Sequence, residues 1–256
     1  MAISKEEKRA IIEGLINNHS TLCPDLFDKN NLLLPHVKSK IDDIVAFIKN
    51  GALRSFSEIK IIDISLNGSL CSYVYGSESD IDLFIVVDDI VPNDKWLTEK
   101  ILNGINSHLF MLTSKPELYG HPVDFGVLHY QNKRVNDFNS YSVLNNCWKK
   151  EPVRQEFDFD VDELYQKYKD YSQELHKFVA SLNKINDAFL MADSCEKLGQ
   201  YLQNLRNKAF EAKENSDKHE YSLDYVLYRL LKKFGAYGHF LEYIKVSAKN
   251  NMRRGE

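Results

Sequence analysis

Two aspartates at the head of an apolar run are the residues of this chain best suited to chemistry. Asp80 and Asp82 flank Ile81 at the start of the run IDLFIVV. A buried carboxylate is costly unless it is paired or bound to a metal ion. Because alternate residues of a strand point to one face, the two carboxylates share a side, with their Cα atoms about 6.5–7 Å apart. This arrangement predicts a site for one or two divalent cations.

Magnesium is the ion that this pair fits best, with manganese as the alternative. Mg²⁺ prefers oxygen ligands and keeps several waters, which suits a site completed by substrate phosphates. Two such ions about 3.5–4 Å apart can hold the attacking and leaving oxygens of a displacement at phosphorus. The structural alternative is that both acids are solvated at the entry of a strand.

A Gly-Ser pair precedes the two aspartates and predicts a place for phosphate. Gly68 and Ser69 directly follow a first apolar run, IKIIDISL. A glycine lets the backbone turn sharply and approach a ligand closely, and free N–H groups at the first turn of a helix attract anions. We therefore expect Gly68 and Ser69 to bind phosphate, whereas the second pair, at Gly76, is predicted to be a turn.

The order of these residues resembles a known signature. Gly68-Ser69, ten further residues and then Asp80-Ile81-Asp82 inside an apolar strand are similar to the motif of the DNA polymerase β-like nucleotidyltransferase superfamily. The resemblance covers roughly residues 58–130. It implies that Gly68 and Ser69 hold a nucleoside triphosphate and that Asp80 and Asp82 hold both metal ions.

The resemblance also implies a third carboxylate on a later strand. The stretch HPVDFGV supplies one at Asp124, which would bind the catalytic metal ion and help to deprotonate an acceptor hydroxyl. Asp63, Asp88 and Asp89 are the competing acids near the core. We prefer Asp124 because it lies between Val123 and Phe125, in an apolar context.

Positive charge is missing where many small members of the superfamily carry it. The residues after the Gly-Ser pair, LCSYVY, are uncharged, which leaves Ser69, the backbone or a distant lysine or arginine to neutralise a triphosphate. A first basic set lies beside the predicted core at Lys133, Arg134, Lys149, Lys150 and Arg154. A second, which could bind nucleic acid or form a solvated helical face, is the basic C-terminal end, comprising Arg229, Lys232, Lys233, Lys245, Lys249, Arg253 and Arg254.

The elements expected around these residues give an α/β (α+β) fold with a mixed or parallel sheet. Apolar and β-branched runs predict strands at 59–66, 81–87 and 121–129. Helical spacing predicts helices at 4–18, 36–50 and 94–114. The last of these joins two strands as a crossover, which favours parallel pairing.

Composition changes beyond about residue 156, where helical spacing alone continues. We expect one long helix at 161–189, a second that starts at a capping box formed by Asp193 and Glu196, and further helices at 221–234 and 239–250. These would form an antiparallel helical bundle. The boundary near 150–158 gives a nucleotidyltransferase core at 1–155 and a bundle domain at 156–256.

Bulk properties restrict the remaining choices. A net charge of −4 argues against a strongly basic nucleic-acid binder. The N-terminal segment is charged where a signal peptide would be apolar, and no apolar run approaches about 18–20 residues, so we expect a cytoplasmic protein with no membrane partner. The four cysteines and eight histidines show no metal-binding spacing. The acids of DFDVD at 158–162 are predicted to be the first turn of the long helix, with a second metal site as the alternative.

The sequence thus predicts a Mg²⁺-dependent enzyme that transfers a nucleoside monophosphate from a nucleoside triphosphate to a hydroxyl and releases pyrophosphate. The acceptor class stays open among nucleic acid, small molecule and protein. The alternative is a non-catalytic nucleotide-binding or scaffold protein that retains the fold. A nuclease that uses the same carboxylates lacks any supporting histidine motif.

Overall fold

The structure, a computed structural model of the 256-residue chain, divides into two compact units. One is the sheet unit, residues 17–154, and the other is the helical unit, residues 1–16 with 155–256. The described residues are 4, 6, 9, 10, 12, 14, 17–51, 53–54, 59–77, 79–110, 116–136, 139–182, 184–185 and 187–233.

The division at 154 falls inside the predicted boundary interval, but the first sixteen residues belong with the helices and not, as expected, with the sheet. Arg9 illustrates the reason, since its guanidinium donates a hydrogen bond of 3.1 Å to the carbonyl oxygen of Phe157. The helix predicted at 4–18 lies largely outside the described residues.

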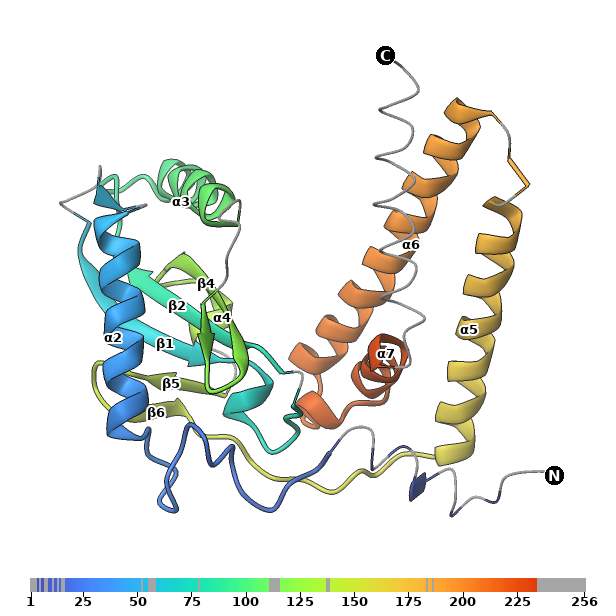
Figure 1. The fold of residues 1–256 in the computed structure, drawn as a ribbon, viewed down its shortest axis with the longest axis horizontal. Helices are drawn as coiled ribbons and strands as arrows, with labels where there is room; N and C mark the ends of the chain where they lie inside the picture. The colour runs from blue at the N-terminus through green and yellow to red at the C-terminus, as the bar shows by residue number, and fades with distance from the viewer. Residues whose placement is uncertain are drawn as a thin grey trace. The chain divides into compact units, whose positions relative to one another are not determined.

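A six-stranded mixed sheet with flanking helices confirms the predicted α/β class (Figure 1). Its strand order is β3-β4-β2-β1-β5-β6. The β2 and β4 strands run parallel and are connected through α3, whereas the other neighbours pair antiparallel. The elements of this unit are α2 (Pro35–Asn50), β1 (Ile61–Asn67), the 3₁₀ turn η2 (Ser69–Cys71), β2 (Ile81–Val87), α3 (Lys95–Phe110), β3 (Glu117–Leu118), β4 (His121–His129), α4 (Lys133–Asn136), β5 (Ser140–Ser142) and β6 (Cys147–Lys150).

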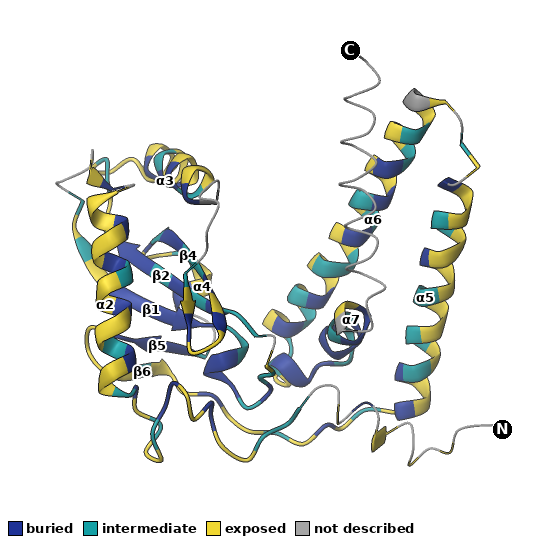
Figure 2. Cartoon of the chain, in the orientation of Figure 1, coloured by how far each residue is buried: buried dark blue, intermediate teal, exposed yellow. Residues whose placement is uncertain are grey.

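Alternation along the strands separates an apolar face of the sheet from a polar one. On β2 the side chains of Ile81, Leu83 and Ile85 are buried, and those between them are half-buried at Asp82 and Phe84. The buried set packs with apolar residues of α2 and α3 in one core, and Figure 2 shows the buried strands beneath the exposed outer side of α2. The polar residues of the strands therefore face away from this core.

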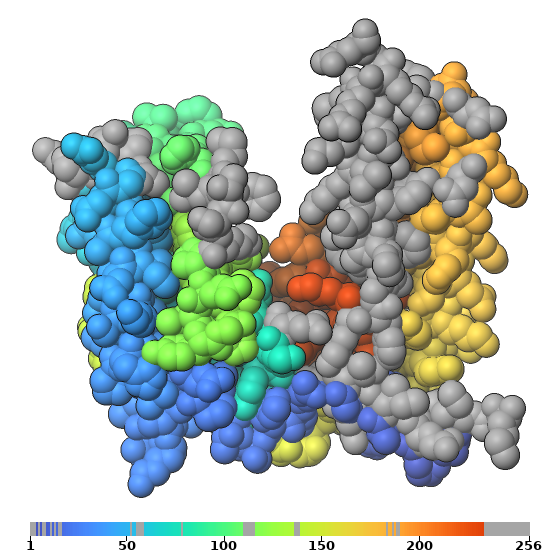
Figure 3. All heavy atoms as spheres, in the orientation of Figure 1, coloured from blue at the N-terminus to red at the C-terminus, as the bar shows by residue number. Residues whose placement is uncertain are grey.

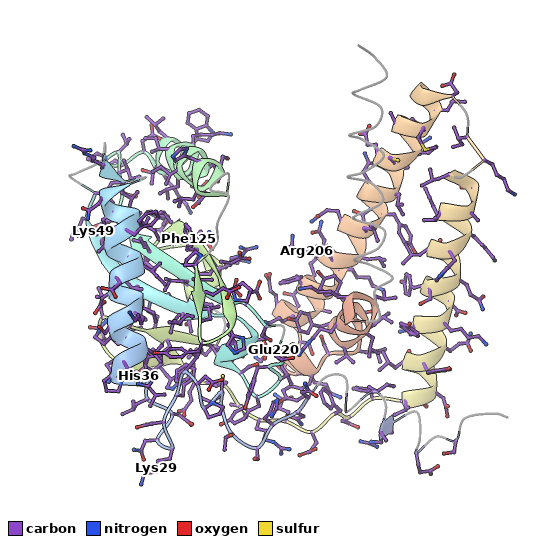
Figure 4. The ribbon with its side chains drawn as sticks, in the orientation of Figure 1. Lys29, His36, Lys49, Phe125, Arg206 and Glu220 are labelled. Carbon is purple, nitrogen blue, oxygen red and sulfur yellow. The ribbon has the colours of Figure 1, made fainter. Side chains whose placement is uncertain are left out.

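The α2 helix begins at Pro35, whose fixed φ suits the first helical position. The first turn of α2 also contacts the turn between β3 and β4. There the rings of His36 and Tyr119 meet edge-on with centroids 5.3 Å apart. In Figure 3 the atoms of α2 (blue) and those around residues 117–136 (green) lie side by side on the visible face. Phe125 of β4, labelled in Figure 4, is partly buried and packs against the core.

The outer edge of β4 is closed by a side chain of α3. Asn106 donates from Nδ2 to the carbonyl oxygen of Val127 over 2.8 Å and accepts from the Val127 amide over 2.7 Å. It thereby replaces the neighbouring strand that β4 lacks beyond the two residues paired with β3. Gly126 lies next to the side-chain amide of Asn106. A Cβ added at Gly126 would lie 3.2 Å from Oδ1 of Asn106, so α3 approaches β4 closely.

The helical unit consists of α5 (Val161–Leu182), α6 (Ala188–Asn215), η3 (His219–Tyr221) and α7 (Leu223–Lys233). The α5 and α6 helices run in opposite directions (Figure 1), and α7 packs against both. A buried ion pair of 2.8 Å joins Lys213 of α6 to Glu220, labelled in Figure 4. Replacing either partner alone would remove the opposite charge from the other, which is destabilising for a buried group.

Two predicted helix boundaries in this unit are wrong. The helix expected at 161–189 ends at Leu182, and α6 starts at Ala188 and not at Asp193. The reason is a cap within the apolar pattern, because the Asp187 carboxylate accepts from the Leu190 amide over 2.9 Å. Asp193 lies within α6 and forms an ion pair with Lys197.

The helix predicted at 239–250 lies outside the described residues, as does the basic C-terminal end after residue 233. Within the part of the chain that the structure describes, none of the helices is both long and apolar enough to cross a membrane.

Replacing Asn106 with alanine should lower the free energy of unfolding by about 2–4 kcal/mol, because it leaves the buried amide and carbonyl of Val127 without partners. Chemical denaturation measures this change. Asn103→Ala, at an exposed position of the same helix, should alter stability by no more than about 0.5 kcal/mol. Equal losses in the two variants would contradict the edge-closing role of Asn106.

Candidate functional site

Three carboxylates converge at one end of the sheet. In the parallel pairing of β2 with β4, Asp82 lies opposite Asp124, and Asp80 directly precedes β2. Carboxylate oxygens of all three residues lie within 4.8 Å of one another, and all three side chains are half-buried. The structure therefore places Asp124 beside Asp80 and Asp82, as the sequence predicted.

Apolar neighbours fix this placement. Ile81 pairs with Val123 one step before Asp82 pairs with Asp124. Both apolar side chains are essentially inaccessible, at 1% and 0% exposure. A shift of the register by one residue would carry a carboxylate into the core and an apolar side chain out of it, so the packing of the pair holds the two aspartates on the polar face.

Gly68 approaches this site so closely that only glycine fits. It follows Asn67, which lies opposite Asp82 in the β1–β2 ladder, and its φ of +87° is strained for any residue with a side chain. A Cβ at this position would collide with a carboxylate oxygen of Asp82 and lie 3.1 Å from its Cγ. Gly68 is thus a point of close backbone approach to the Asp82 carboxylate, whereas its binding of phosphate stays a prediction.

The hydroxyl of Ser69 joins the two segments of the motif. It donates to the Ser79 hydroxyl over 2.8 Å, and that oxygen also accepts from the Gly76 amide over 3.0 Å. The carbonyl oxygen of Ser79 accepts from Nδ1 of His121 over 2.8 Å. These contacts therefore fix the position of Ser79, the residue before Asp80. The sequence predicted no role for Ser79 beyond its position next to Asp80, and it predicted that His121, which flanks Asp124 together with His129, is a structural histidine, with substrate contact as the alternative.

Asp63, the first competing acid, has a structural environment. It is buried on β1, where Lys149 Nζ lies 2.5 Å from one carboxylate oxygen and the Ser142 hydroxyl donates to the other over 2.7 Å. This pairing joins β1 to β5 and β6. Asp63 is therefore not one of the carboxylates of the site, and Lys149 pairs with Asp63 inside the sheet.

Asp88 and Asp89 lie at the opposite end of β2. The backbone amide of Asp89, and next the ammonium of Lys60, hold the pKa of Asp88 below its usual value. Asp89 accepts from His129 over 2.8 Å. Neither acid belongs to the site.

The acids at 158–162 also have a helical explanation. The Asp160 carboxylate accepts from the amides of Asp162 and Glu163 over 2.8 and 3.2 Å. It thereby satisfies N–H groups at the start of α5, which have no partners within the helix. These contacts support the prediction that this stretch opens the long helix.

One residue of the first basic set, Arg134, is joined through its backbone to the strand that pairs with β2. The carbonyl oxygen of Arg134 in α4 accepts from the Asn67 side chain over 2.6 Å, and Asn67 pairs with Asp82 across the ladder. The Arg134 side chain is exposed.

Replacing Gly68 with alanine should lower the free energy of unfolding by about 1–3 kcal/mol, because the added methyl group meets Asp82 and the positive φ becomes strained. It should also weaken Mn²⁺ binding, since Asp82 must rotate away. Thermal unfolding and calorimetry measure the two effects. Gly104→Ala in α3, where a Cβ meets nothing within 4 Å, should show neither loss. An unchanged Mn²⁺ affinity in Gly68→Ala would contradict the close approach of Gly68 to the Asp82 carboxylate.

Comparison with protein-family models, curated proteins and solved structures gave no significant match. A function for this chain must therefore be inferred from its sequence motif and from the geometry of its site. Both centre on Asp80, Asp82 and Asp124.

Proposed function

We propose that this chain is a magnesium-dependent nucleotidyltransferase of the polymerase β-like kind. It would transfer a nucleoside monophosphate from a nucleoside triphosphate to a hydroxyl acceptor and release pyrophosphate. Asp80 and Asp82 would hold both metal ions, and Asp124 the ion beside the acceptor. Gly68 and Ser69 would hold the triphosphate.

The observation that carries this proposal is the convergence of three carboxylates from two paired strands within 4.8 Å. The donor set consists of oxygen atoms only, which is the preference of Mg²⁺. Such ions, when bound, neutralise charge on the phosphates and align the reacting oxygens. Three like charges at this separation also favour binding a cation over remaining empty.

The reaction would be a single displacement at the α-phosphorus. The acceptor oxygen forms a bond to the α-phosphorus while the bond from that phosphorus to the bridging oxygen breaks, and pyrophosphate leaves with the electron pair. Asp124 accepts the proton of the acceptor hydroxyl. The backbone beside Gly68 and the hydroxyl of Ser69 orient the triphosphate, so catalysis depends chiefly on positioning and charge neutralisation.

Arg134 completes the proposed site. A triphosphate needs more positive charge than the uncharged segment after Ser69 supplies. Arg134 is exposed, and its backbone is hydrogen bonded to the residue opposite Asp82. A guanidinium can bind phosphate oxygens through two parallel hydrogen bonds, so we assign Arg134 to the triphosphate.

Asp82→Asn should lower the rate of label transfer from α-labelled nucleoside triphosphates at least about 100-fold, because it removes a metal-binding charge. The assay combines the full chain with Mg²⁺, each nucleoside triphosphate and RNA, protein or small polyhydroxyl acceptors. Asp88→Asn, a carboxylate change at the opposite end of β2, should retain the rate.

Undiminished transfer by Asp82→Asn would exclude the assigned mechanism. Calorimetry distinguishes an enzyme from a non-catalytic relative that keeps the fold. The enzyme should bind a nucleoside triphosphate only with Mg²⁺, and Asp80→Asn should abolish that binding. If the affinity for the nucleoside triphosphate is the same without Mg²⁺ and in Asp80→Asn, the chain is not the proposed transferase.

Arg134→Gln should raise the Kd for a nucleoside triphosphate about tenfold or more, because a hydrogen bond from a charged group contributes about 1.5–3 kcal/mol. Titration with a fluorescent triphosphate analogue in Mg²⁺ measures this change. Lys60→Gln, which removes a cation at the other end of the strands, should leave the Kd unchanged. A Kd that responds equally to both changes would indicate only a general effect of net charge.

A further inference from the structure

A second group of potential metal ligands lies in the sheet unit, outside the carboxylate site. The Cys23 sulfur, an Asp25 carboxylate oxygen and a ring nitrogen of His121 lie within 4.8 Å of one another. Cys23 and His121 are buried, at 1% and 6% exposure, whereas Asp25 is exposed. The group is therefore an interior site with a side open to solvent.

Its ligands come from two segments distant in the sequence. Cys23 and Asp25 flank Pro24 in the segment before α2, where the Cys23 carbonyl accepts from the amides of Leu26 and Phe27 over 3.1 and 2.9 Å. This tight turn brings the sulfur and the carboxylate together. His121 opens β4, where it pairs with β3. Ordered elements thus fix both halves of the group.

Hydrogen bonding of His121 selects the tautomer that a metal ligand needs. Its Nδ1 lies 2.8 Å from the carbonyl oxygen of Ser79. Because a carbonyl oxygen can only accept, Nδ1 carries the proton, and in the neutral ring Nε2 keeps its lone pair. A histidine that binds a metal through one nitrogen commonly donates from the other to a backbone carbonyl in this way.

We propose that Cys23, Asp25 and His121 bind a single Zn²⁺ ion. Sulfur, imidazole nitrogen and carboxylate oxygen are the three ligand types of zinc in proteins. Tetrahedral coordination would draw the ligand atoms to about 3.3–3.8 Å from one another, a small contraction that the exposed Asp25 side chain permits. Water or an outside ligand occupies the fourth position, on the solvent side.

A cysteine nucleophile activated by His121 is the rival use of the same residues. Reactive thiols are partly exposed and have lowered pKa values. Cys23 is 1% exposed, and burial, which outweighs the amides of Asp25 and Leu26 that bond to the sulfur, raises its pKa. These features oppose nucleophilic attack on a substrate, whereas a bound metal ion removes the thiol proton outright.

The zinc ion would stabilise the backbone segments that carry the carboxylate site. His121 precedes Asp124 on the same strand, and its Nδ1 holds Ser79, the neighbour of Asp80. A metal bound to His121 would thus fix both segments that carry the aspartates. Zinc binding itself does not depend on the proposed transferase activity.

Cobalt titration of the purified full chain tests this site. Mg²⁺ in excess occupies the all-oxygen group, and Co²⁺ serves as the spectroscopic substitute for zinc. We expect a single equivalent of Co²⁺ to give the near-ultraviolet absorption of a thiolate bound to cobalt, which added Zn²⁺ removes. Cys23→Ser should abolish this absorption, and Asp25→Ala should weaken Co²⁺ binding at least about tenfold.

Two controls make the test specific. Cys147→Ser, which removes an exposed thiol, and Asp82→Asn should each retain the absorption. Because Asp25 is exposed, its replacement keeps the test valid if Cys23→Ser fails to fold. Absorption that is absent from the unaltered chain, that survives Cys23→Ser, or that shows the same affinity in Asp25→Ala would overturn the proposal.

Discussion

Parallel pairing of β2 with β4 is the constraint on which the candidate site depends. It sets Asp82 against Asp124 on the polar face while Ile81 and Val123 pack on the other. Carboxylates this close repel each other unless a cation or a proton intervenes. Burial of the apolar neighbours opposes that repulsion, because each fully buried aliphatic side chain contributes about 1.5–3 kcal/mol. The sheet can therefore hold a charge cluster that isolated strands could not.

The segments around this pairing are tied to it by short polar contacts. Gly68 fits against the Asp82 carboxylate because it lacks a side chain. Ser69 bonds to Ser79, and Ser79 bonds to His121. The end of β1, the approach to β2 and the start of β4 thus form one hydrogen-bonded arrangement. Groups held in this way need little reorganisation when charge develops between them, which is the condition for electrostatic catalysis.

Two donor sets of different chemistry lie along this arrangement. The three aspartates offer only oxygen and suit a hard ion that exchanges with substrate. The group of Cys23, Asp25 and His121 offers sulfur, nitrogen and oxygen and suits an ion that stays bound. His121 connects the two through Ser79. Ligand type would therefore keep the two proposed ions, Mg²⁺ and Zn²⁺, apart within the sheet unit.

The sequence by itself determined the local elements and the first half of the site. Strong apolar periodicity predicted β2 and β4 at the bounds that the structure has, and the spacing of Asp80 and Asp82 placed them on one face. These features depend on neighbours in the chain, so a local pattern is enough to predict them. The short strands β5 and β6 carry no such pattern, and the cap at Asp187 starts a new helix inside a stretch that the apolar spacing alone predicted as one continuous helix.

Only the tertiary structure decided which distant groups meet. Asp63 and Asp124 both lie in apolar strands, and strand pairing directs one to Lys149 and the other to Asp82. Cys23 and His121 showed no metal-binding spacing because they belong to separate segments that the sheet brings together. Contacts of this kind depend on chain closure and strand order, which the sequence encodes only through the packing of the whole unit.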